Sequence, residues 1–81
     1  MSKEKVQSIF REVFENDGLE IFPEMTARDV VKWDSFNHIN LIISLEEAFQ
    51  VRFTTEEISK MANVGDLVKV LQAHGKDVSW Q

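Results

Sequence analysis

The sequence contains no cysteine, one proline and three glycines, and it has no long apolar run. Without cysteine, the chain has no disulfide framework, no thiolate zinc site and no cysteine nucleophile. The scarcity of glycine and proline leaves little room for the tight turns of a small β-barrel. The longest apolar run, residues 41–43, is far shorter than the roughly 20 residues of a membrane span. Because no apolar segment of the signal-peptide kind follows the first residues, we expect a cytoplasmic protein without membrane insertion.

The 81 residues suffice for one small domain, in which about 60% of the surface of the unfolded chain becomes buried. Hydrophobic residues make up 43% and charged residues 28%, a balance typical of globular proteins. The net charge of −5 argues against nucleic-acid binding, which requires a basic surface. Six acids and two bases lie in residues 34–66, so this acidic middle would attract a basic partner.

Four segments show the apolar spacing of amphipathic helices, and none shows strand alternation. The first covers about residues 3–15 with Ser2 as N-cap, and the second covers about residues 34–50 with Asp34 as N-cap. The third is short and opens with a capping box between Thr54 and Glu57. The fourth begins after Asn63 as N-cap and ends at Gly75.

The predicted fold is therefore all-α: a small four-helix bundle with a long loop between the first two helices and a short third helix. Residues 1–75 form the single domain, and residues 76–81 are expected to be a flexible tail. The loop, about residues 19–33, is unusually long unless its own side chains pin it to the core. The apolar residues available for this are Leu19, Ile21, Phe22, Met25, Val30, Val31 and Trp33.

The second helix has more apolar residues than one buried face requires. One row would face the core and consists of Leu41, Ile42, Leu45, Ala48 and Phe49. A second row lies on another side at Phe36, Ile39 and Ile43, and Glu47 continues it. The second row is either covered by the long loop or exposed to a partner. For Ile39 the two alternatives are balanced, whereas exposure is favoured for Phe36 and Ile43.

The second helix begins with Asp34-Ser35-Phe36. A serine at the first helical position presents its hydroxyl beside unsatisfied backbone N–H groups and the positive end of the helix dipole. A phosphate attached there would be stabilised. Taken alone, the pair Asp34-Ser35 also fits an ordinary helix cap.

The residues that follow the motif give it a context. Asp34-Ser35-Phe36 is followed in order by Ile39, Leu41, residues 45–49, residues 54–58 and residues 64–68. This order and spacing resemble the acyl carrier protein family, in which an Asp-Ser-Leu motif opens the second helix. The resemblance is close over residues 34–71.

The resemblance implies a cofactor and a carrier role. Ser35 would receive 4′-phosphopantetheine from coenzyme A through a phosphopantetheinyl transferase, and Asp34 would help to engage that transferase and its metal. The thiol of the arm would carry acyl groups as thioesters to acyl-loading and acyl-using enzymes of fatty-acid, polyketide or other specialised biosynthesis. The protein itself would be a monomer and no enzyme.

The resemblance also implies a partner surface on the second helix. Its apolar part would be Phe36, Ile39 and Ile43, and Glu47 would add an acidic contact. Three further acids are either part of this surface or merely solvated: Glu46, Glu56 and Glu57. His38, one turn beyond the serine, is interpreted as a surface or partner contact rather than an acid–base group.

Three features depart from the common family pattern. Phe36 replaces a leucine, and Asn37 and Asn40 stand where fatty-acid carriers usually have acids. A less acidic helix slows electrostatically steered encounter, so we expect a stand-alone carrier of a specialised pathway. No Gly-Gly pair precedes Ser35, which makes amino-acid loading less favoured.

The sequence leaves one alternative function open and disfavours another. An unmodified carrier-like module would use the second helix only to bind a protein partner. An enzyme would need a nucleophile, a base and an oxyanion site, for which the 81 residues show no pattern.

Overall fold

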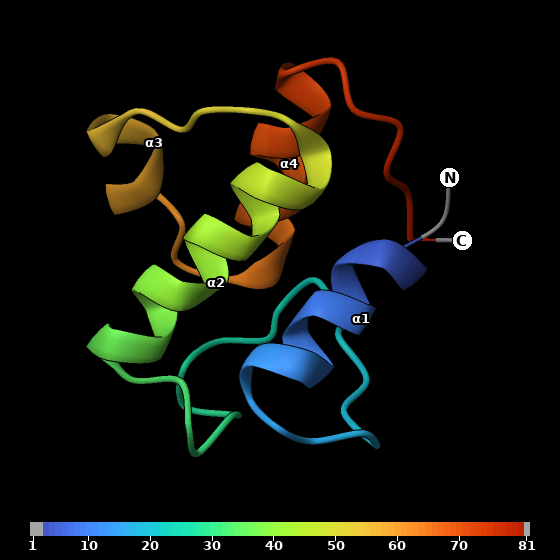
Figure 1. Cartoon of the computed structure of the whole chain (residues 1–81), viewed down its shortest axis with the longest axis vertical. Coiled ribbons are helices and arrows are strands. Elements are labelled where there is room, and N and C mark those ends of the chain that lie inside the picture. The colour runs from blue at the N-terminus through green and yellow to red at the C-terminus, as the bar shows by residue number, and fades with distance from the viewer. Residues whose placement is uncertain (1–2, 81) are drawn as a thin grey trace.

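A computed structural model describes residues 3–80, which form four helices connected by loops (Figure 1). The helices are α1 (Glu4–Val13), α2 (Ser35–Phe49), α3 (Thr55–Ser59) and α4 (Val64–Ala73). No β-strand occurs in this part of the chain. The prediction of an all-α fold with a long first loop and a short third helix is confirmed. None of the four helices combines the length and the apolar character needed to cross a bilayer.

Side-chain caps start three of the helices, as predicted. Asp34 accepts a hydrogen bond from the Asn37 N–H at the start of α2, and Asn63 accepts one from the Asp66 N–H at the start of α4. Thr54 opens α3 with a complete capping box. These bonds satisfy N–H groups that have no partner inside the helix, so they define where each helix begins.

Two further helix boundaries rest on other signals. Ser2, the predicted N-cap of α1, lies outside the described residues, and the N-cap position is Lys3, whose side chain makes no capping bond. Gly75 follows α4 with a φ of 82°, in the left-handed region where glycine carries no steric cost. The predicted end of α4 at this glycine is confirmed.

The core lies where α1, α2 and α4 face one another and the long loop. Its buried residues are Val6, Phe10, Phe14, Ile21, Met25, Val30, Leu41, Ile42, Leu45, Phe53, Met61, Val64, Leu67, Val68, Leu71 and Val78. In α2 only the row containing Leu41, Ile42 and Leu45 is fully buried, as predicted. Ala48 and Phe49 are half-buried.

The long loop contributes some of its apolar residues to this core but not all. Ile21, Met25 and Val30 are buried, and Leu19 and Trp33 are partly buried against the cluster. The prediction was wrong for Phe22 and Val31, which are 43% and 101% exposed. Each directly follows a buried residue, and its side chain leaves the core because Ile21 and Val30 occupy the inner positions.

Hydrogen bonds from α1 and α4 hold this loop in place. The Arg11 Nε donates to the Leu19 carbonyl at 2.7 Å, and the Gln7 side chain accepts from the Ile21 N–H at 2.9 Å. From α4, the Gly65 N–H donates to the carbonyl of Pro23 at 2.8 Å. The first part of the loop is thus tied to both α1 and α4.

The C-terminal segment runs back from the end of α4 (Figure 1). Val78 is buried, and the Gln72 side chain donates to its carbonyl at 2.8 Å. Trp80 packs against the core cluster. The segment is therefore anchored through Val78, and the flexibility expected of residues 76–81 stays a prediction.

Candidate functional site

Ser35 is exposed at the first position of α2, directly after its N-cap. Asp34 has extended backbone angles, and its carboxylate accepts the Asn37 N–H at 2.8 Å. The Ser35 hydroxyl has no hydrogen-bond partner among residues 3–80, so no neighbouring base activates it. The first turn of α2 contains no acid. A negatively charged group on Ser35 would meet the positive end of the helix dipole. The Asp34 carboxylate lies beside it and already accepts the Asn37 N–H.

Trp33 and His38 form a hydrogen-bonded pair beside this serine. The indole Nε1 of Trp33 donates to the Nδ1 of His38 at 3.0 Å, and the two rings are inclined by 18°. Burial lowers the pKa of His38 from its ordinary value of 6.5 because the charged form loses solvation. The sequence interpretation of His38 as a surface contact missed this internal bond.

Trp33 itself is held by two aromatic side chains, one from α1 and one from its C-cap residue. Phe10 meets it edge-on with ring centroids 5.5 Å apart, and Phe14 lies at 5.6 Å. The first helix therefore fixes the orientation of the indole, and the indole fixes that of His38. The pair connects the core directly to the start of α2.

A groove of about 620 Å³ opens beside Ser35. Its residues from the loop and α2 are Ala27, Trp33, Asp34, Ser35, His38 and Ile39, and Met61 and Ala62 close it from the connection between α3 and α4. The walls are mainly apolar, with polar groups gathered near the serine. Such a groove can receive a flexible group that is attached to Ser35.

The second apolar row of α2 is exposed. Phe36, Ile39 and Ile43 are 72%, 60% and 49% exposed, and Glu47 is exposed as well. The alternative in which the loop covers this row is wrong, because the loop packs against α1 and α4 instead. The row gives α2 an apolar outer face that nothing in residues 3–80 covers.

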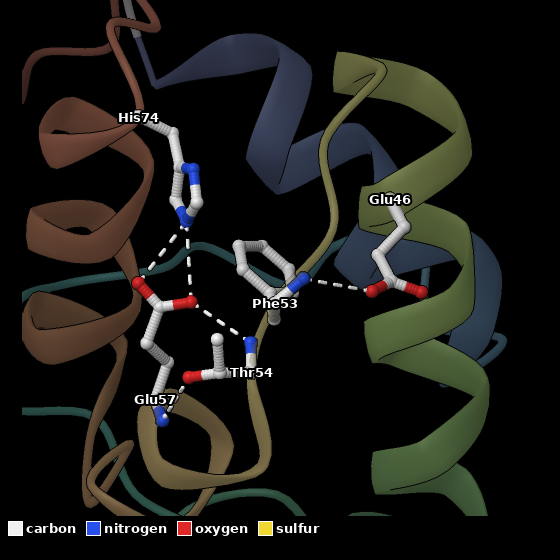
Figure 2. Close-up of polar contacts among 5 residues, drawn as sticks. All are labelled: Glu46, Phe53, Thr54, Glu57 and His74. Atoms are coloured by element: carbon white, nitrogen blue, oxygen red, sulfur yellow. Dashed lines mark hydrogen bonds and ion pairs between the residues drawn. The ribbon is translucent and has the colours of Figure 1, made fainter.

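Two of the four candidate acids form hydrogen bonds with other parts of the chain (Figure 2). The Glu46 carboxylate accepts the Phe53 N–H at 2.9 Å and ties the connection after α2 back to that helix. Glu57 accepts the Thr54 N–H at 2.9 Å and contacts the His74 Nε2 at 3.1 Å. The bond from Thr54 and then the one with His74 lower the pKa of Glu57. Both acids therefore serve first to hold α3 and its flanking segment.

The contact between Glu57 and His74 joins the first turn of α3 to the end of α4 (Figure 2). It had no signal in the sequence, because 17 residues separate the two side chains. The remaining candidate acids are more open. Glu47 has no ion-pair partner in residues 3–80, and Glu56 lies 3.8 Å from Lys60 on the surface.

Residues 3–80 contain no cluster of three or more acidic or histidine side chains able to hold a metal ion.

No family model matches the chain. It is 35% identical to the acyl carrier protein of Clostridium acetobutylicum over 74 residues, 91% of this chain and 96% of that protein. It is 33% identical to the acyl carrier protein of Helicobacter pylori over 69 residues, 85% of this chain and 88% of that protein.

The chain belongs to the acyl carrier protein family. Acyl carrier proteins with solved structures share its fold. A holo acyl carrier protein from Geobacter metallireducens superposes with a TM-score of 0.82 at 38% identity, over 86% of this chain and 80% of that one. A structure from Mycobacterium tuberculosis, at 19% identity and a TM-score of 0.80, supports the fold alone.

Proposed function

We propose that Ser35 carries 4′-phosphopantetheine, which a phosphopantetheinyl transferase transfers from coenzyme A. The single observation that carries the proposal is an exposed serine without a hydrogen-bond partner in residues 3–80, at the first position of α2, in a chain of this family. The transfer joins the Ser35 oxygen to the phosphate of the pantetheine arm and releases the nucleotide part of coenzyme A. The dipole of α2 favours the resulting phosphodiester charge.

The arm explains how a chain without cysteine handles thioesters. Its thiol holds an acyl group, and residues 1–75, as one carrier domain, present that group to acyl-loading and acyl-using enzymes. Catalysis belongs to those partners, since a nucleophilic serine would need an activating base within hydrogen-bond reach. We propose that the protein works in this way as a cytoplasmic monomer.

Asp34 has a second role in this proposal. Its carboxylate caps α2, and it lies on the surface next to the modified serine. It is therefore accessible to a transferase and to a metal ion bound there. Partner enzymes would dock on the exposed row Phe36, Ile39 and Ile43 and on Glu47.

Asn37 and Asn40 support a specialised pathway rather than general fatty-acid synthesis. The Asn37 side chain donates to the Lys32 carbonyl at 2.7 Å, and the Asn40 side chain donates to Asn37 Oδ1 at 3.3 Å. A carboxylate at either position has no N–H to donate and loses such a bond. With amides at these positions, α2 lacks two acidic contacts for a partner, and the loop is linked more firmly to the helix.

Intact mass after incubation with coenzyme A and a broad-specificity transferase tests the proposal. The wild type gains one phosphopantetheine group, and Ser35→Ala gains none. Ser44→Ala, on the same helix, is the matched control and gains the group like the wild type. A folded wild-type protein without mass gain, beside a carrier that the same transferase modifies, would refute attachment. It would favour the unmodified module that only binds a partner through α2.

A further inference from the structure

The hydrogen bond between Trp33 and His38 determines which nitrogen of His38 carries a proton. An indole N–H only donates, so the Nδ1 of His38 at 3.0 Å accepts and carries no hydrogen. A neutral imidazole has one N–H, which must then be at Nε2. Because Trp33 packs against both Phe10 and Phe14, this arrangement is built into the fold.

The Nε2–H of His38 is a donor without a partner among residues 3–80. His38 and Ser35 are three residues apart on α2, so their side chains are neighbours on one helix face. Both line the groove described above. A group attached to Ser35 that lies in this groove would therefore be close to the imidazole.

We propose that His38 is a positioning residue that donates its Nε2–H to a phosphodiester oxygen of the arm on Ser35 and so directs the arm into the groove. The proposal rests on the attachment of phosphopantetheine to Ser35. It assigns Trp33 an indirect part, since the indole selects the tautomer that can donate. Met61 and Ile39 then flank the first segment of the arm in the groove.

A neutral donor suits a carrier because it guides the arm without a fixed ion pair. Burial keeps His38 uncharged near neutral pH. Asp34 is the other titratable group that lines the groove in the described part of the chain, and its carboxylate already accepts the Asn37 N–H. The phosphodiester would therefore be the main new charge near His38 after modification.

The two histidines and two tryptophans of the chain provide an experiment with internal controls. NMR spectra of the ring signals are recorded across a pH series, before and after modification, with intact mass measured on each sample. The phosphodiester anion raises the pKa of His38 by about half a pH unit, the shift expected for unit charges roughly 5 Å apart in water. The titration curve of His74, at the far end of α4, stays in place.

The tautomer of His38 is tested in the unmodified protein through the NMR chemical shifts of its two ring nitrogens. The wild type shows His38 with its proton on Nε2. Trp33→Phe removes the indole donor and yields a mixture of both tautomers, whereas Trp80→Phe, the matched control, leaves His38 unchanged. His38→Gln keeps a side-chain N–H donor, so its ³¹P signal after modification resembles that of the wild type, and His38→Leu shifts it.

The outcomes separate the two proposals. Full mass gain with an unmoved His38 titration overturns the role of His38 and leaves attachment at Ser35 intact. Equal movement of His38 and His74 also overturns it, because the effect is then not local. Absence of mass gain overturns attachment and with it the positioning role.

Discussion

Replacement of Gly65 by alanine should destabilise the protein, although alanine is the better helix former. Gly65 is the second residue of α4, and its N–H donates to the Pro23 carbonyl at 2.8 Å. A Cβ at this position would lie 2.9 Å from the same carbonyl oxygen, closer than real Cβ atoms approach such an atom. The loop must therefore move away from α4 to admit the methyl group.

Opposing contributions set the size of this effect. Alanine gains about 1 kcal/mol in helix propensity. Displacement of the loop weakens two backbone bonds of about 1 kcal/mol each, from Gly65 to Pro23 and from Val64 to Met25. It also disturbs the packing of the buried Met25 side chain, at about 1–3 kcal/mol. The net expectation is a loss of about 2–4 kcal/mol in the free energy of unfolding.

Urea unfolding followed by circular dichroism measures this loss. Gly18→Ala is the matched control, since a Cβ there would have its nearest neighbour at 3.7 Å. We expect this control to remain within about 0.5 kcal/mol of the wild type. A Gly65→Ala protein as stable as the wild type would refute the reasoning, because the close approach of loop and helix would then carry no energetic weight.

Three further predictions concern charge. Burial lowers the pKa of His38 in the folded protein, so this side chain takes up a proton more readily in the unfolded chain. The free energy of unfolding therefore falls as the pH drops from 6.5 through the lowered pKa. The urea midpoints of His38→Gln should not show this fall. The pKa of Glu57 is also lowered, so its stabilisation is complete above about pH 4.5 and disappears as pH falls through the lowered pKa. A flatter acid unfolding curve for Glu57→Gln would confirm this, and an unchanged one would contradict it. Glu47→Lys should weaken transferase binding more at low than at high salt, and equal weakening in titration calorimetry would point to lost packing instead.

The helix boundaries could be predicted because their signals are local. A cap needs only a side chain and an N–H group three residues later, as at Asp34, Thr54 and Asn63. The core row of α2 follows from spacing alone. The sequence could not show which loop residues point into the core. An irregular backbone has no fixed period that would distinguish the buried Ile21 from the exposed Phe22.

The site was predicted only in part, for a related physical reason. The position of Ser35 depends on one helix start and could be inferred from its motif. The bond between Trp33 and His38 depends on how Phe10 and Phe14 orient the indole, which requires the packed α1. No local pattern reports on such packing, so the sequence interpretation left His38 on the surface.

The exposed row of α2 and the rigid start of that helix can be understood together. A small bundle buries one face of α2, and burial of Phe36 would require a covering element that the long loop does not supply. The loop instead packs against α1 and α4, and near its end the Lys32 carbonyl accepts a hydrogen bond from the Asn37 side chain. Ser35 therefore lies on a firmly held helix start, next to an apolar surface that residues 3–80 leave exposed. A carrier needs both properties, since its cargo must move while its docking face keeps one shape.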